Sequence, residues 1–119
     1  MLQRAPAAGE VAAFAADAGR EVLDLSALND DLEDMLALMA LLDDYVAVSN
    51  TNVHLRQSLG RASRVLVPMP PDWRWMNAGD QSPWFPGTSV YRQAADGAWD
   101  AALGRLSHDL KPVFSRSAP

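Results

Sequence analysis

Polar side chains follow a short apolar segment near the middle of the chain, at Asn50, Thr51, Asn52 and His54. Residues 45–49 are typical of a buried strand, and the polar residues come where the next helix begins. A helix start presents unpaired amides and the positive end of the helix dipole, which favour a bound phosphate. Hydroxyl, amide and imidazole groups add donors to phosphate oxygens. The pattern therefore predicts a diphosphate site at this strand-to-helix junction.

The same junction has a purely structural interpretation. Asn or Thr at a helix start is commonly a cap, and a lone histidine commonly satisfies a local hydrogen bond. The sequence also lacks a glycine-rich phosphate motif at this point. From the sequence, the cap and the phosphate site both remain open.

A second candidate is the proline- and tryptophan-rich segment 68–87, which follows an apolar run at residues 65–67. Long irregular loops are often functional, aromatic faces suit a base or sugar ring, and an arginine suits a phosphate. Alternatively, the tryptophans only anchor an ordered surface loop. Because the loop leaves the same sheet edge as the junction, we expect it to shape a base or sugar pocket. The residues assigned to that pocket are Trp73, Arg74, Trp75 and Trp84.

Strand-like and helix-like segments alternate along the chain. We expect a Rossmann-like three-layer α/β/α domain with a mainly parallel sheet of about five strands, over residues 1–112, and a frayed tail at 113–119. A helix start is expected at Asn29 or Asp30, and Pro112 is expected to stop the last helix. Expected strands lie at 1–4, 22–25, 45–49, 65–67 and 89–92, and expected helices at 6–19, 30–42, 52–59 and 98–110.

Composition narrows the classes of partner. The 119 residues carry 10 basic and 15 acidic side chains with no basic run, so a nucleic acid is a poor candidate partner. There is no cysteine, and His54 and His108 alone are too few for a zinc site, so no metal or cofactor is expected. No apolar window is long enough for a membrane span and no signal peptide is evident, which favours the cytoplasm. No catalytic triad can be argued, so no catalytic residue is assigned.

Several motifs together resemble a known family. The most specific are the Asn-Thr-x-x-His-Leu junction at residues 50–55 and the Trp-Arg-Trp to Ser-Pro-Trp loop at residues 73–84. The chain resembles the C-terminal glycosyltransferase-like domain of bacterial tetratricopeptide-repeat proteins, which is similar to lipopolysaccharide heptosyltransferases and to protein O-linked N-acetylglucosamine transferases. The resemblance extends from Leu2 to about Leu110. Its further pieces are residues 2–4, 9–10, 23–26, 41–44 and 59–61.

The resemblance implies the C-terminal half of a GT-B glycosyltransferase fold, which binds a nucleotide-sugar donor without a divalent metal. The family's diphosphate-binding motif falls on Thr51 and His54. Asn50 stands where many relatives carry aspartate. Arg56-Gln57 replaces a small Ala-Gly pair, which would crowd the helix start or add a positive charge near it.

The acceptor-binding half, which in this fold usually supplies the catalytic base, does not precede residue 1 in the given sequence. We therefore expect a donor-binding half that is inactive alone and that is completed by an N-terminal domain or a partner chain, with self-association as a secondary expectation. The alternative function is a non-catalytic interaction module that keeps the fold and has lost the donor site.

Overall fold

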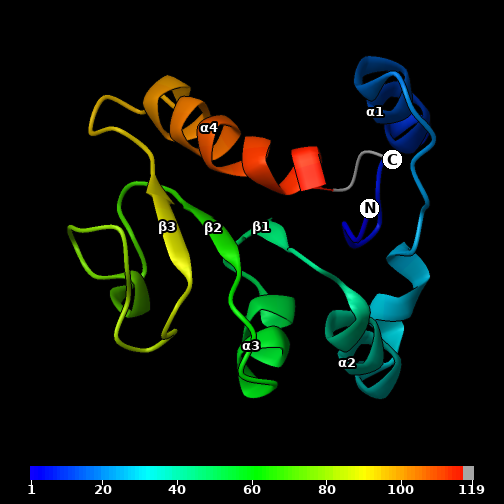
Figure 1. Cartoon of the computed structure of the whole chain (residues 1–119), viewed down its shortest axis with the longest axis horizontal. Coiled ribbons are helices and arrows are strands. Elements are labelled where there is room, and N and C mark those ends of the chain that lie inside the picture. The colour runs from blue at the N-terminus through cyan, green and yellow to red at the C-terminus, as the bar shows by residue number, and fades with distance from the viewer. Residues whose placement is uncertain (117–119) are drawn as a thin grey trace. The chain divides into compact units, whose positions relative to one another are not determined.

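The computed structural model of the chain describes residues 1–116 (Figure 1). The chain divides into two compact units, Met1–Leu38 and Met39–Pro119, and the prediction of one domain over residues 1–112 stays a prediction. In the described part, the order of elements is α1 (Glu10–Ala18), η1 (Ser26–Asp30), α2 (Leu32–Leu41), β1 (Val46–Val48), α3 (Thr51–Ser58), β2 (Arg64–Val67), η2 (Trp73–Trp75), β3 (Ser89–Arg92) and α4 (Asp100–Arg116).

The first unit contains helices but no strand within the described residues, so the strands predicted at 1–4 and 22–25 are wrong. The two segments do meet, because the amino group of Met1 donates to the Leu23 carbonyl (2.6 Å) and the Leu25 amide donates to the Met1 carbonyl (3.0 Å). The pairing does not extend into a ladder, and the Asn29 side chain of η1 donates to the next carbonyl, that of Leu2 (2.9 Å).

Helix α2 begins later than predicted. The carboxylate of Asp31 accepts from the amides of Glu33 (2.8 Å) and Asp34 (3.0 Å), which makes Asp31 the capping residue. Asn29 and Asp30, the predicted caps, belong instead to the short 3-10 helix η1. The spacing of its leucines and methionines predicts this helix from the sequence. The structure buries Met39 of that apolar face completely.

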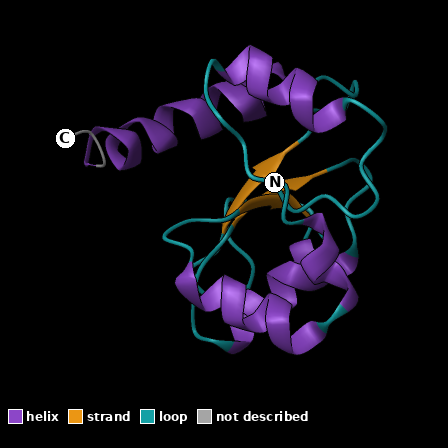
Figure 2. Cartoon of the chain, turned by 90° about the vertical axis from the view of Figure 1, so that its right-hand side faces the viewer, coloured by secondary structure: helices purple, strands orange, loops and turns teal. Residues whose placement is uncertain are grey.

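The second unit is built on a parallel sheet, and its described strands number three in the order β1-β2-β3, not about five (Figures 1 and 2). The β1-α3-β2 connection is a helical crossover, as parallel strands require. Figures 1 and 2 place α3 and α4 on opposite sides of the sheet. On the α4 side the buried core consists of Tyr91, Ala102 and Leu106, with Leu66, Trp99 and Leu110 packed against it.

Helix α4 extends past Pro112, so the predicted stop is wrong. Proline lacks an amide and removes one hydrogen bond, but the turns on either side of that gap still bond, and the Ser115 hydroxyl donates to the Lys111 carbonyl (2.9 Å). Residues 113–116, predicted as a frayed tail, are therefore helical, while residues 117–119 lie outside the described residues.

A buried arginine joins α3 to the end of α2. Arg56 is only 3% exposed. Its guanidinium donates to the carbonyls of Met39 (2.9 Å), Leu42 (3.1 Å), Asp43 (3.2 Å) and Ala62 (2.6 Å). These groups include carbonyls at the C-terminal end of α2, which lack partners within their own helix. The expectation that Arg56 crowds the start of α3 or places a positive charge there is wrong. Its guanidinium instead binds these four backbone carbonyls.

Burial lowers the pKa of Arg56, and the nearby carboxylates of Asp44 and Asp43 oppose that shift. The group nevertheless stays charged at neutral pH, since an arginine is not deprotonated in proteins. Removing a buried charged donor leaves its acceptors without partners. Each acceptor left unpaired and away from water lowers the stability of the folded state.

Arg56→Ala should therefore lower the free energy of unfolding by about 3 kcal/mol, because several buried carbonyls lose a charged donor. Arg61→Ala is the matched control, since Arg61 is exposed and donates to the same Leu42 carbonyl (3.3 Å). The control should cost less than about 0.5 kcal/mol. Urea denaturation followed by far-ultraviolet circular dichroism measures both, and equal losses would show that Arg56 has no special role.

Candidate functional site

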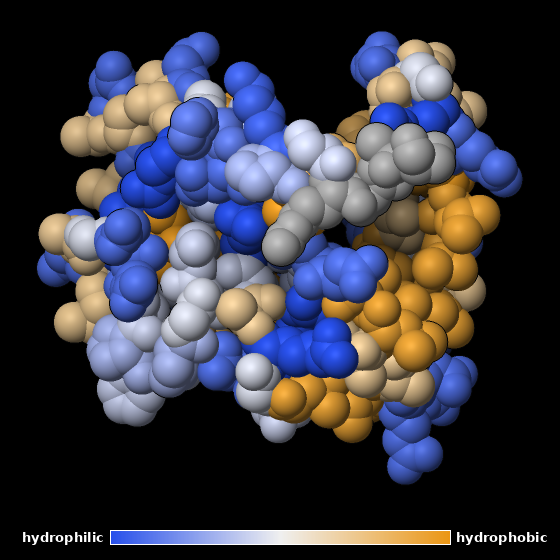
Figure 3. Space-filling view, in the orientation of Figure 1, coloured by the Kyte–Doolittle hydropathy of each residue, from blue (hydrophilic) through white to orange (hydrophobic). Residues whose placement is uncertain are grey.

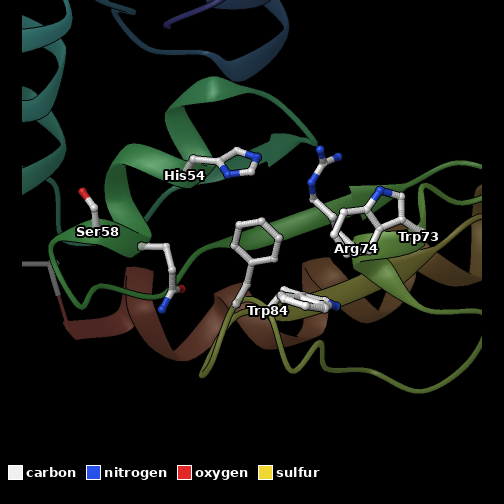
Figure 4. Close-up of a pocket in the computed structure, with 7 residues that line it drawn as sticks. His54, Ser58, Trp73, Arg74 and Trp84 are labelled. Carbon is white, nitrogen blue, oxygen red and sulfur yellow. The ribbon is translucent and has the colours of Figure 1, made fainter.

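The fold brings α3 and the tryptophan-rich loop 68–87 together around one open pocket (Figure 4). Both follow the carboxyl ends of neighbouring parallel strands, β1 and β2, which is the reason for their proximity. The pocket has a volume of about 270 Å³. It is lined by His54, Gln57 and Ser58 of α3 and by Trp73, Arg74, Trp84 and Phe85 of the loop.

A stack of aromatic rings forms the inner wall of the pocket. Trp75 is fully buried and lies parallel to Phe85, with ring centroids 4.4 Å apart and 14° between the planes. The imidazole of His54 meets Phe85 edge-on at 5.0 Å and 78°. Phe85 thus contacts the exposed histidine ring on one side, and Trp75 stacks on Phe85 without lining the pocket itself. The indole Nε1 of Trp75 has no hydrogen-bond partner among the residues described.

The other two tryptophans of the loop behave differently. Trp73 is 62% exposed and Trp84 is 57% exposed, and their rings meet edge-to-face at 5.1 Å and 86°. Exposed rings in this arrangement offer a flat apolar face, on which a sugar or base ring can stack. Trp73, Trp84 and His54, all predicted site residues, therefore share one pocket (Figure 4).

Arg74 lies at the edge of the same pocket, beside the ring of Trp73 (Figure 4). Its Cζ is 4.9 Å from the Trp73 ring centroid, within the range of a cation–π interaction. Its Nη1 donates to both carboxylate oxygens of Asp72, at 2.9 and 3.0 Å. The positive charge expected to meet a phosphate is thus already paired with a carboxylate.

The remaining predicted residues, Asn50, Thr51 and Asn52, do not line this pocket. The Asn50 side chain accepts from the Val53 amide (3.2 Å), so it caps α3 as the structural interpretation predicted. Thr51 is exposed and Asn52 is buried. The structure joins His54 to the tryptophan loop, and the diphosphate site at the helix start stays a prediction.

Arg92, which the sequence analysis did not single out, holds the loop in place. It is the last residue of β3, and its guanidinium donates to the carbonyls of Trp75, Met76 (2.9 Å), Ala78 (3.1 Å) and Gly79 (2.7 Å). These bonds surround Met76, whose φ of 60° is unfavourable for a side-chain-bearing residue. Burial and then the nearby Arg105 lower the pKa of Arg92. A sequence signal for this role would have been an arginine ending an otherwise buried strand beside a long loop.

The loop has a second tie to β3, because the Val90 amide donates to the Asp80 carbonyl (2.8 Å). Within the loop, the Ser82 hydroxyl donates to the Arg74 carbonyl. The loop that carries Trp73 and Trp84 is therefore held mainly through its own backbone carbonyls, which accept from the Arg92 and Ser82 side chains and from the Val90 amide.

Comparison of the chain with protein families, with curated proteins and with solved structures found no match. The resemblance to glycosyltransferase-like domains therefore stays a prediction from the sequence motifs. In the part of the chain that the structure describes, no helix is both long and apolar enough to cross a membrane. The same residues contain no cluster of three or more His, Asp or Glu side chains suited to a metal ion.

Arg92→Ala should loosen the tryptophan loop, since it removes a charged donor from several carbonyls at once. We expect hydrogen-exchange protection in residues 73–87 to fall by at least about tenfold, as the loss of one charged hydrogen bond implies. Arg105→Ala is the control, because Arg105 bonds the Val90 carbonyl of the same strand but not the loop. Equal loss of loop protection in the two variants would contradict the role given to Arg92.

Proposed function

We propose that this chain binds a nucleotide sugar and acts as the donor-binding half of a glycosyltransferase-like protein. One observation carries the proposal, namely that His54 of α3 lines the same pocket as Trp73, Arg74 and Trp84 of the loop. These residues are up to 30 positions apart in the sequence, which predicts a phosphate-binding role for His54 and a base or sugar pocket for the three loop residues at the same sheet edge.

The chemistry of the lining supports a ligand with a ring and polar substituents. The Trp73–Trp84 pair provides the stacking surface, and His54, Gln57 and Ser58 provide hydrogen-bonding groups. The volume of about 270 Å³ suits one sugar or base ring with an adjoining phosphate. The rest of a nucleotide sugar would extend out of the open mouth, toward an N-terminal domain or a partner chain.

No catalytic residue is assigned to this chain. His54 is the one imidazole in the lining, and its place against Phe85 suits a donor to the leaving diphosphate. In this proposal the base that activates the acceptor belongs to another domain or chain. Turnover by this polypeptide alone is not expected.

A non-catalytic interaction module is the second candidate function. Trp73 and Trp84 favour it, because exposed tryptophans are enriched among residues that dominate protein–protein binding. The Asn50 side chain also favours it, since it is engaged in the helix cap and does not line the pocket.

Titration of the chain with nucleoside diphosphates and nucleotide sugars, followed by backbone amide NMR, tests the first function. We expect saturable shifts at residues 54–58 and 73–85. His54→Ala should weaken binding by about tenfold, because it removes a hydrogen-bond donor to a charged ligand. His108→Ala is the matched control, since His108 is exposed on α4 and does not line the pocket.

Two results would contradict the proposed function. Absence of shifts with millimolar ligand would favour the interaction module. Equal affinities for His54→Ala and the wild-type chain, with shifts outside residues 54–58 and 73–85, would mean that the ligand binds outside this pocket.

A further inference from the structure

The pairing of Asp72 with Arg74 affects how strongly the pocket can bind a negatively charged ligand. Arg74 lines the pocket, and the Asp72 carboxylate, which does not line it, is paired with Arg74 at 2.9 Å; the two side chains are 38% and 43% exposed, respectively. Asp72 also fixes the short helix η2, because its Oδ1 accepts from the Arg74 amide (3.0 Å). Arg74 is therefore held by its own turn, next to the exposed Trp73–Trp84 pair.

The guanidinium is only partly used in this arrangement. Both bonds to Asp72 come from Nη1. Within the described residues the structure gives no hydrogen bond to Arg74 Nε or Nη2, and a guanidinium has five N–H donors. A phosphate could therefore approach the open edge of Arg74, but it would do so beside the Asp72 carboxylate.

We propose that Asp72 is a specificity-determining residue, which competes with the phosphates of a ligand for Arg74. Its carboxylate occupies one nitrogen of Arg74 and repels any anion that approaches the others. The inference rests on the proposed function, because it assigns a role within the same nucleotide-sugar pocket.

The competition acts most strongly on the most highly charged ligand. A terminal phosphate carries up to about one more negative charge at pH 7 than a phosphate bonded on both sides. A free nucleoside diphosphate is therefore penalised more than the nucleotide sugar from which it is formed. A neutral sugar is not penalised at all. Asp72 thus favours retention of the donor and release of the diphosphate left after transfer.

Asp72→Asn tests this role, because an amide keeps the oxygen that caps η2 and removes the charge that pairs with Arg74. The probes are inorganic pyrophosphate, uridine and adenosine diphosphates, their glucose conjugates, and free glucose. We expect the affinity for the diphosphates to rise about three- to fivefold, since an exposed ion pair contributes up to about 1 kcal/mol. Affinity for the nucleotide sugars should rise less, and affinity for glucose should not change.

Asp80→Asn is the matched control, because it removes the same charge from the same loop. Asp80 is exposed, and its tie to Val90 uses its backbone carbonyl. The control should change diphosphate affinity by less than about twofold, since a distant exposed charge is screened. In Asp72→Asn combined with Arg74→Ala, the gain should disappear.

The outcomes separate the two proposals. Diphosphate binding by the wild-type chain with no greater gain in Asp72→Asn than in Asp80→Asn would overturn the inference and leave the proposed function standing. A gain that persists without Arg74, or one that extends equally to glucose, would also overturn it. Absence of binding to every probe, in the wild-type chain and in all variants, would overturn both.

Discussion

The guanidinium of Arg92 is the constraint on which the candidate site depends. The loop 68–87 has few carbonyl groups bonded in a helix or a sheet, so its path depends on other hydrogen-bond donors. Arg92 supplies donors to the carbonyls of Trp75, Met76, Ala78 and Gly79 from a single side chain. Since Trp73 and Arg74 precede this turn and Trp84 follows it, the distance between the two exposed tryptophans depends on the turn.

Arg56 has a comparable role between α3 and the end of α2, because it donates to the carbonyls of Met39, Leu42 and Ala62. Both arginines donate to several backbone carbonyls at once, and among the described residues neither guanidinium is hydrogen-bonded to a carboxylate. The desolvation of each charge is offset by its carbonyl partners. This arrangement lets a small sheet hold a long irregular segment.

The sequence predicted the helices and strands that are determined by residues within or next to them. Apolar runs between turn residues indicated β2 and β3, and the capping residue Asn50 indicated the start of α3. The parallel order, with its helical crossover, also predicted that His54 and the tryptophan loop would lie at one sheet edge. Residues 1–4 and 22–25 have the same apolar character as a strand, but a strand exists only where a partner offers a ladder.

Long-range contacts were beyond local inference. Nothing near Arg92 or Arg56 in the sequence indicates which carbonyls they bond, because those carbonyls lie 13 to 17 positions from Arg92 and 6 to 17 positions from Arg56. The sequence also did not indicate which tryptophans of the loop are buried and which are exposed. Trp75 is two residues from Trp73, yet the turn of η2 buries one ring beneath Phe85 and leaves the other in solvent.

The difference in exposure between Trp75 and the Trp73–Trp84 pair should be visible in the tryptophan fluorescence of the chain. Trp75 is shielded from water, and its Nε1 is unbonded in the described part of the chain, so its fluorescence should lie at short wavelength and resist quenching by acrylamide. Trp73 and Trp84 are open to solvent and should emit at longer wavelength and quench readily. A ligand stacked on the exposed pair would alter the second emission and spare the first. In a Trp99→Phe variant, which removes the half-buried tryptophan packed beside α4, occupancy of the pocket and integrity of the core can thus be measured separately in one unlabelled sample.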